Sequence, residues 1–235
     1  MAARDIVIPA DAGAVAIVDL DAIAENFRLI QATCPGANVG ASVKASAYGL
    51  GVGPVTATLA KAGCTSFFVA TPAEGLQLRG AGLTTENVAE IVVLNGPERE
   101  NAALFVGNGL TPTLNSLAQI ETWSAHGDKS QAAWLHVDTG MNRLGLGPKE
   151  IETLIAEPAR LDGVSISTIL SHLACADTPD HPMNAAQRDD FAAACARLTP
   201  IIGAVQTSLA NSSGAFLGPD FHFDLVRPGA SLYGI

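Results

Sequence analysis

The chain has 235 residues, 48% of them hydrophobic, and a formal net charge of −10. This composition excludes disorder and suits one large domain or two small ones. No cluster of lysine and arginine could neutralise successive phosphates, so neither nucleic acid nor an anionic membrane is an expected partner. The start, MAARDIVIPADAG, has no signal-peptide core, and no apolar run reaches the roughly 18 residues of a membrane span.

The cysteines lie in small or apolar sequence without CxxC spacing, at Cys34, Cys64, Cys175 and Cys195. This usage favours reduced thiols, so we expect a cytoplasmic protein. No set of potential ligands has the spacing of a metal site, and we expect none.

The predicted elements begin with a short strand, AVAIVDL (14–20), and a helix over 20–34 with Asp19 or Asp21 as N-cap. Eight further runs of strand length follow: 39–45, 66–70, 90–95, 111–115, 132–138, 164–173, 205–211 and 225–234. Helical stretches separate them at 53–63, 72–80, 98–107, 116–127, 147–157, 184–198 and, more briefly, 212–218. Eight nearly continuous apolar strands alternating with helices favour a closed parallel (β/α)8 TIM-like barrel of the α/β class over a doubly wound sheet.

No linker or low-complexity segment divides the chain, so a single barrel domain over 1–235, with the short leading strand, is the simplest interpretation. The sequence stops where the eighth strand would finish, with no helix to cover it. We therefore expect a further segment to be missing.

In such barrels the functional side chains stand at the C-terminal ends of the strands. The polar residues found there are Lys44, Tyr48, Asn95, Asn115, Asp138 to Arg143, His172, Asn211, Ser212 and Arg227. Lys44 is one of only four lysines and ends an apolar run, where an ammonium group is either a liability or a nucleophile. The last two loops are rich in serine and glycine, as in barrel phosphate sites. An amine beside a phosphate site suits pyridoxal 5'-phosphate.

Six stretches, in order, carry a resemblance to the amino-terminal barrel of the alanine racemase family of fold-type III pyridoxal-phosphate enzymes. They are VDLDAIAENFR, VKASAYGLG, HVDTGMNRLGL, SHLACADTPDHPMNAAQ, LANSSG and HFDLVRPGASLYGI. The resemblance implies racemisation of L- and D-alanine by abstraction of the α-proton. It also implies a place in D-alanine supply for peptidoglycan precursors, and a homodimer for the intact family member.

The same resemblance assigns residues. Lys44, Arg143 and His172 would be catalytic, and the cofactor would contact Lys44, Tyr48, Leu94, His172, Asn211, Ser212, Arg227, Gly229 and Ala230. Asp177 would border the mouth of the substrate site. Arg227 would face the pyridine nitrogen, which then stays neutral because arginine keeps its proton. A weaker electron sink favours quick reprotonation, and hence racemisation over transamination.

The sequence departs from the family pattern at Ser46, where Asp or Asn is usual, and at Leu50, where His is frequent. His136 stands where many relatives have a lysine whose carbamate steadies the arginine at the Arg143 position, so the orientation of Arg143 stays open. The family continues into a β-rich domain that supplies a tyrosine as second base. Tyr233 belongs to the barrel-ending motif and is not expected to replace it, so a barrel alone should racemise poorly.

From the residues alone, alternatives stay open. Lys44 could be a snorkelling lysine, His172 a satisfied core histidine, and Arg143 with Asp138 a loop ion pair. Asn211 and Ser212 could simply cap the short helix after them. The alternative function is a single-domain barrel that binds or carries pyridoxal phosphate without turnover. A phosphate-binding barrel without pyridoxal would leave Lys44 and Arg227 unexplained.

Overall fold

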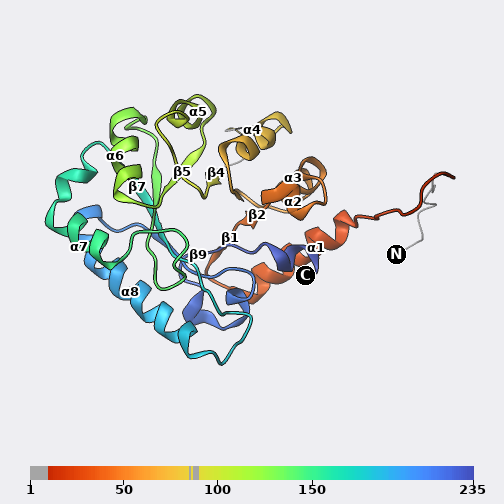
Figure 1. Cartoon of the computed structure of the whole chain (residues 1–235). Coiled ribbons are helices and arrows are strands. Elements are labelled where there is room, and N and C mark those ends of the chain that lie inside the picture. Colours follow the sequence, from red (N-terminus) through yellow and green to blue (C-terminus); the bar gives the residue numbers. More distant parts are fainter. Residues whose placement is uncertain (1–9, 85, 87–89) are drawn as a thin grey trace.

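The structure is a computed structural model that describes residues 10–84, 86 and 90–235 (Figure 1). Most of the start that we interpreted as lacking a signal peptide lies outside these residues. The strands are β1 (Asn38–Val39), β2 (Ala41–Ser42), β3 (Ser66–Val69), β4 (Glu90–Val93), β5 (Thr111–Leu114), β6 (Ala133–His136), β7 (Ile166–Leu170), β8 (Gln206–Ser208) and β9 (Leu225–Val226). Strands β2 to β8 form one parallel sheet in chain order, and β1 pairs in parallel with β9.

Backbone hydrogen bonds carry this sheet round into a ring. Between β8 and β9, Asp224 N donates to Thr207 O at 3.0 Å and Arg227 N donates to Ala210 O at 2.9 Å. β1 and β2 are one strand interrupted at Gly40, where any side chain would collide with the Phe68 ring. The predicted TIM-like α/β barrel is confirmed.

The helices surround the strands in Figure 1. They are α1 (Leu20–Thr33), α2 (Lys44–Tyr48), α3 (Val52–Lys61), α4 (Pro72–Gly80), α5 (Ala102–Asn108), α6 (Leu117–His126), α7 (Pro148–Ala156) and α8 (Pro182–Ile202). Asp19 is the N-cap of α1, since its side chain accepts from Ala22 N at 3.0 Å. Within the described ranges, none of these helices has the length and apolar character needed to cross a membrane.

Three sequence predictions of local structure were wrong. The leading segment 14–19 forms no strand, and Val15 and Ile17 are 44% and 65% exposed. A strand needs a partner for its backbone groups, and the described residues offer this segment none. The last predicted strand ends at Val226, because Pro228 has no N–H to donate, and Ala230–Tyr233 is a 3-10 turn. Similarly, the strand predicted over 39–45 ends at Ser42, before Lys44.

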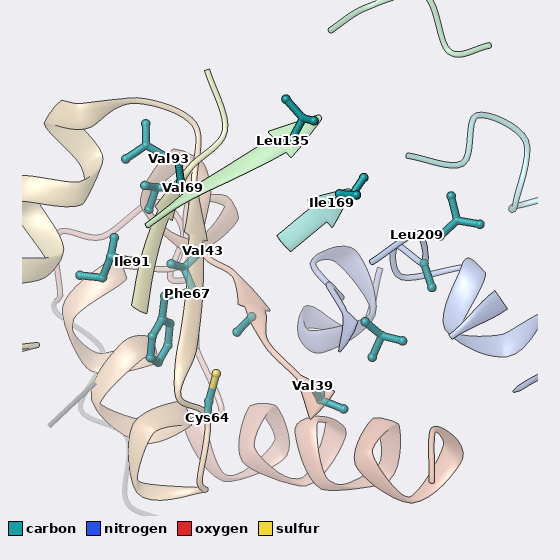
Figure 2. Packing of buried hydrophobic residues seen from close by; sticks show 14 of the residues in the cluster. Val39, Val43, Cys64, Phe67, Val69, Ile91, Val93, Leu135, Ile169 and Leu209 are labelled. Atoms are coloured by element: carbon teal, nitrogen blue, oxygen red, sulfur yellow. The ribbon is translucent and has the colours of Figure 1, made fainter. Parts of the chain in front are cut away.

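Successive side chains along each strand point to opposite faces of the sheet, and the structure therefore has two apolar cores. Phe67, Val69, Ile91 and Val93 belong to the larger cluster between the strands and the helices, part of which Figure 2 shows. The residues of the opposite face fill the barrel interior: Phe68, Val92, Trp134, Leu170 and Leu225. Each fully buried side chain of this size contributes about 2 kcal/mol of transfer free energy. Because both faces of each strand are covered, the strands have the continuous hydrophobicity noted in the sequence.

The interior core contains one acidic contact. Trp134 packs edge-on against Phe68, with ring centroids 5.5 Å apart, and its Nε1 donates to Glu90 Oε1 at 2.8 Å. Burial raises the pKa of Glu90, while the hydrogen bonds from Trp134 and Thr111 lower it by less. Because the folded-state pKa lies above the unfolded one, the native state favours the protonated acid, and stability falls as pH rises above the ordinary glutamate pKa of about 4.3.

We predict that Glu90→Gln stabilises the chain at pH 7 by about 1 kcal/mol, because the amide keeps an acceptor for Trp134 without a buried charge. Thermal unfolding followed by circular dichroism at pH 7 and pH 4 measures the effect, which should shrink at pH 4. Glu100→Gln, at an exposed position, is the control for the same change in net charge. Equal stability of Glu90→Gln and the parent at pH 7 would contradict the assignment.

Candidate functional site

A cavity of about 260 Å³ opens where the strands end. Every predicted catalytic or cofactor-binding residue lines it: Lys44, Tyr48, Leu94, Arg143, His172, Asn211, Ser212, Arg227, Gly229 and Ala230. Each of them follows the C-terminal end of a strand, from β2 to β9. The structure therefore brings together side chains that lie up to 186 positions apart in the chain, as a closed parallel ring requires.

Six further residues complete the wall, namely Ser42, Phe68, His136, Leu144, Leu170 and Ser213. Phe68 and Leu170 are members of the interior core, so the core forms the apolar floor of the cavity. The sequence could have identified Phe68 and Leu170. Every second side chain of a barrel strand faces the interior, and these two lie near the C-terminal ends of their strands, where the cavity opens. Asp177, in contrast, is exposed and is not among the lining residues.

The charge of this wall has one sign. Lys44, Arg143 and Arg227 line the cavity, and none of its lining residues is Asp or Glu. Three cations without a carboxylate favour a ligand with several negative charges, such as a phosphate ester.

Lys44 begins a strained turn. The four residues after it have left-handed φ values of 51° to 55°, at Ala45, Ser46, Ala47 and Tyr48. This conformation costs roughly 1–2 kcal/mol for each non-glycine residue. Hydrogen bonds hold it: Ala45 N donates to Glu74 Oε1 at 2.8 Å, and Val52 N donates to Ser46 Oγ at 3.3 Å. Strain that the surroundings maintain in this way is typical of functional positions.

Arg227 is almost fully buried and joins three strands. Its guanidinium donates to Ser208 Oγ at the end of β8, and to Ser171 O, just after β7, at 2.6 Å. Burial lowers the pKa of Arg227 to about 10, which still leaves it charged at neutral pH. Two hydrogen bonds occupy part of a group with five N–H donors, so donors remain for a ligand.

His172 is held from two sides. Its Nε2 lies 3.4 Å from Asn211 Nδ2, and its carbonyl oxygen accepts from Gln187 Nε2 at 2.9 Å. Burial, and then the charge of Arg227, lower the pKa of His172 to about 3. The imidazole in the wall is therefore neutral, and Asn211 has a positioning contact besides its capping bond to Gly214 N at 2.9 Å.

The end of the cavity near β9 is built from hydroxyls and amides. Ser212 Oγ accepts from Gly229 N at 2.8 Å and from Ser231 N at 3.3 Å. A side chain at Gly229 would collide with the Tyr48 hydroxyl, so the glycine leaves room for the tyrosine. Tyr233 packs against Tyr48 with the rings tilted by 40° and their centroids 4.9 Å apart, and its hydroxyl donates to Ser42 O at 2.8 Å. Burial raises the pKa of Tyr233, which fixes it as a protonated donor.

Arg143 lies on the loop that follows β6. In this loop Asp138 accepts from Gly140 N at 2.9 Å and from Asn142 N at 3.1 Å, so its carboxylate shapes the backbone. No ion pair between Asp138 and Arg143 occurs among the described residues. Nowhere in residues 10–84, 86 and 90–235 does a group of three His, Cys, Asp or Glu lie so that it could hold a metal ion.

The neutral histidine makes stability dependent on pH. A histidine with a pKa near 3 when folded and about 6.5 when unfolded binds more protons in the unfolded state between these values, so stability falls as pH drops below about 6.5. We predict that His172→Gln removes about 2 kcal/mol of the stability lost between pH 7 and pH 5. Urea unfolding at both values measures it. The exposed His126→Gln is the control, and an unchanged pH slope for His172→Gln would refute the prediction.

Comparison with known proteins agrees with this geometry. Residues 18–235 match the family model of the alanine racemase N-terminal domain. The catabolic alanine racemase of Mesorhizobium japonicum is 45% identical over 229 residues, which are 96% of this chain and 58% of that protein. The alanine racemase of Rhodospirillum rubrum is 46% identical over 227 residues, 95% of this chain and 59% of that protein.

Among solved structures, alanine racemase from Bartonella henselae with covalently bound pyridoxal phosphate superposes with a TM-score of 0.85. It is 40% identical, and the match covers 93% of this chain and 62% of that one. The chain thus spans 58 to 62% of the length of these three relatives. Since the family model covers nearly all of its residues, the chain belongs to the alanine racemase family, over the N-terminal domain.

Proposed function

We propose that this barrel binds pyridoxal 5'-phosphate through Lys44 and forms the cofactor half of an alanine racemase. The observation that carries the proposal is the wall of the cavity, where one lysine amine lies with two arginines and without any acidic side chain. The relatives are named alanine racemases, which supports alanine as the substrate. The similar structure from Bartonella henselae has pyridoxal phosphate bound covalently.

The residues present fit the cofactor. Ser212, with the Gly229 and Ala230 backbone and the Tyr48 hydroxyl, would hold the phosphate at the β9 end of the cavity. Arg227 would face the ring nitrogen with its remaining N–H donors, while neutral His172 and Leu94 would flank the ring. Lys44 Nζ would hold the cofactor covalently at its aldehyde carbon. When bound, the cofactor supplies an electron sink that acidifies the α-hydrogen of an amino acid.

The side chains then have distinct tasks. Once the substrate amine has replaced Lys44 at the aldehyde carbon, the freed Lys44 Nζ would take or return the α-proton on its own side of the substrate, and Arg143 would bind the substrate carboxylate. Arg227 stays protonated, because even the lowered pKa of about 10 lies far above neutral pH, and it limits how much charge the ring nitrogen withdraws. The apolar floor of Phe68 and Leu170 keeps water from the reacting carbon.

One base in this wall serves one face of the substrate. Of the two tyrosines, Tyr48 belongs to the phosphate end and Tyr233 is committed to Ser42 O. We therefore propose that these 235 residues by themselves exchange the α-proton of D-alanine and racemise poorly. In the intact enzyme we propose a cytoplasmic homodimer that makes D-alanine for peptidoglycan. The alternative, a carrier of pyridoxal phosphate without turnover, shares every contact described above and differs only in the proton step.

We predict a single pyridoxyl adduct on Lys44 after incubation with pyridoxal phosphate and borohydride reduction. Lys44 alone of the four lysines lines the cavity. Intact mass and peptide mapping locate the adduct, and Lys44→Arg, which keeps the charge and cannot form the link, should show none. Adducts spread over all four lysines, or present in Lys44→Arg, would rule out the assignment.

We further predict that the cofactor-loaded chain exchanges the α-hydrogen of D-alanine in deuterated water faster than that of L-alanine, by about tenfold or more. Lys44 supplies the base for one enantiomer only. Proton NMR of each enantiomer measures the exchange, and Lys44→Arg should abolish it. No exchange in a chain that carries the Lys44 adduct would support the carrier, and equal rates for both enantiomers would show a second base within these residues.

A further inference from the structure

Gln187 is a buried polar residue for which the proposed function gives no role. It ends the stretch SHLACADTPDHPMNAAQ and lies in the second turn of α8. The residue is 1% exposed, and it is not among those that line the cavity. A buried amide needs hydrogen-bond partners, and the partners of Gln187 show what it holds.

These partners fix the direction of the amide. Its Oε1 accepts from Ala174 N at 2.8 Å, and its Nε2 donates to His172 O at 2.9 Å and to Thr139 Oγ1 at 3.2 Å. A backbone N–H can only donate and a carbonyl can only accept, so a reversed amide would leave both backbone groups without a partner. The oxygen and both N–H groups of Gln187 are therefore engaged.

The backbone of residues 172–174 lies beyond the end of the parallel sheet. Ser171 N donates to Ser208 O at 3.0 Å, which is the last backbone hydrogen bond between the β7 and β8 segments in the described part of the chain. Just after it, the amide of Gln187 bonds to the carbonyl of residue 172 and to the N–H of residue 174. A side chain of α8 thus takes the place of a neighbouring strand.

The third hydrogen bond joins this segment to the loop after β6. Thr139 Oγ1, which accepts from Gln187, lies 2.8 Å from Ser171 Oγ, so the two hydroxyls share a hydrogen bond. Ser171 O in turn accepts from the Arg227 guanidinium at 2.6 Å. One connected set of hydrogen bonds therefore joins α8, the loop after β6, the segment that carries His172, and the buried cation.

We propose that Gln187 is a positioning residue that acts from outside the cavity and fixes the place of His172 in the wall relative to the loop after β6. A neutral amide suits this task, because it satisfies two acceptors and one donor without adding a charge to the buried network. A buried polar network whose members are satisfied in this way is rigid, as a binding site requires. The inference rests on the proposed function only in that pyridoxal phosphate is the ligand of the second test.

The first test needs no cofactor and measures hydrogen exchange of the Ala174 amide by NMR. Thr139→Val removes a hydroxyl that is bonded to Gln187 and not to Ala174, and we expect Ala174 N–H to exchange about fivefold faster or more. Thr139→Ser keeps the hydroxyl and should exchange as the parent does. Rates are compared with that of Cys34 N, which donates to Ile30 O in α1 and reports global opening. An unchanged ratio in Thr139→Val would overturn the proposal whether or not the barrel binds pyridoxal phosphate.

The second test is a double-mutant cycle on the dissociation constant of pyridoxal phosphate, with Gln187→Met and Thr139→Val singly and together. Neither change alters the net charge, and methionine has a similar volume to glutamine. We expect about tenfold weaker affinity for Gln187→Met, about threefold for Thr139→Val, and no further loss in the double variant, because both remove the same connection. Thr139→Ser should bind as the parent does, and the two Thr139 variants decide the matter if Gln187→Met fails to fold.

Asn184→Leu is the matched control. Asn184 lies three residues before Gln187 in α8, is 2% exposed, and donates to Thr178 O at 3.0 Å and to Pro179 O at 3.2 Å. The variant loses a buried amide that holds the same loop further along the chain, and its affinity should stay within about twofold of the parent's.

Three outcomes of the cycle overturn the proposal: additive losses, an unchanged affinity in either single variant, or a folded Asn184→Leu as weak as Gln187→Met. The last would show that any loosening of the loop weakens binding. A parent chain without the Lys44 adduct would instead count against the proposed function, and the hydrogen-exchange measurement would still decide the fate of Gln187.

Discussion

The closure of the barrel and the chemistry of its cavity depend on the same residue, Arg227. Its backbone N–H completes the ring by donating to Ala210 O, and its buried guanidinium joins the ends of β7 and β8 through Ser171 O and Ser208 Oγ. A buried charge is expensive unless it is hydrogen-bonded, and these strand ends supply the acceptors. The cation can therefore stand in the cavity wall only because the strands meet around it. Loss of the ring would remove its partners and the floor of the site together.

That fixed cation also governs its neighbours. Burial is the main cause of the low pKa values of His136 and His172, and the positive charge of Arg227 comes next in both. The wall thus combines cations with neutral imidazoles, and it presents acceptors and donors that do not change their charge near neutral pH. Such a wall selects its ligand by which ligand atoms donate hydrogen bonds and which accept them. Neighbouring amides set the direction of these hydrogen bonds, Asn115 at His136 Nδ1 and Asn211 at His172 Nε2.

The order of apolar runs was sufficient to predict the barrel, and the ends of these runs predicted most of the polar residues of the cavity. Asn95, Asn115 and Asp138, predicted in the same way, do not line it, and Leu94, Gly229 and Ala230 were assigned only through the family resemblance. Prediction from the sequence failed where a partner or a backbone angle decides the structure. The run at 14–20 has the composition of a strand. A strand also needs a partner strand, which composition does not reveal, and the described residues offer this run none. The end of the last strand depends on Pro228, and the role of Asn115 depends on an amide orientation that no sequence pattern encodes.

The turn after Lys44 shows why such details matter for function. A lysine that simply ended a strand could extend its long side chain to water, as in the alternative considered from the sequence. Here the chain after Lys44 turns left-handed for four residues, at a cost of roughly 1–2 kcal/mol each, and Glu74 pins it by accepting from Ala45 N at 2.8 Å. Glu74 also accepts from Ala70 N at 2.6 Å, at the end of β3. The neighbouring strand thus holds the lysine backbone in place, and strain of this size is hard to account for at a lysine that only reaches for solvent.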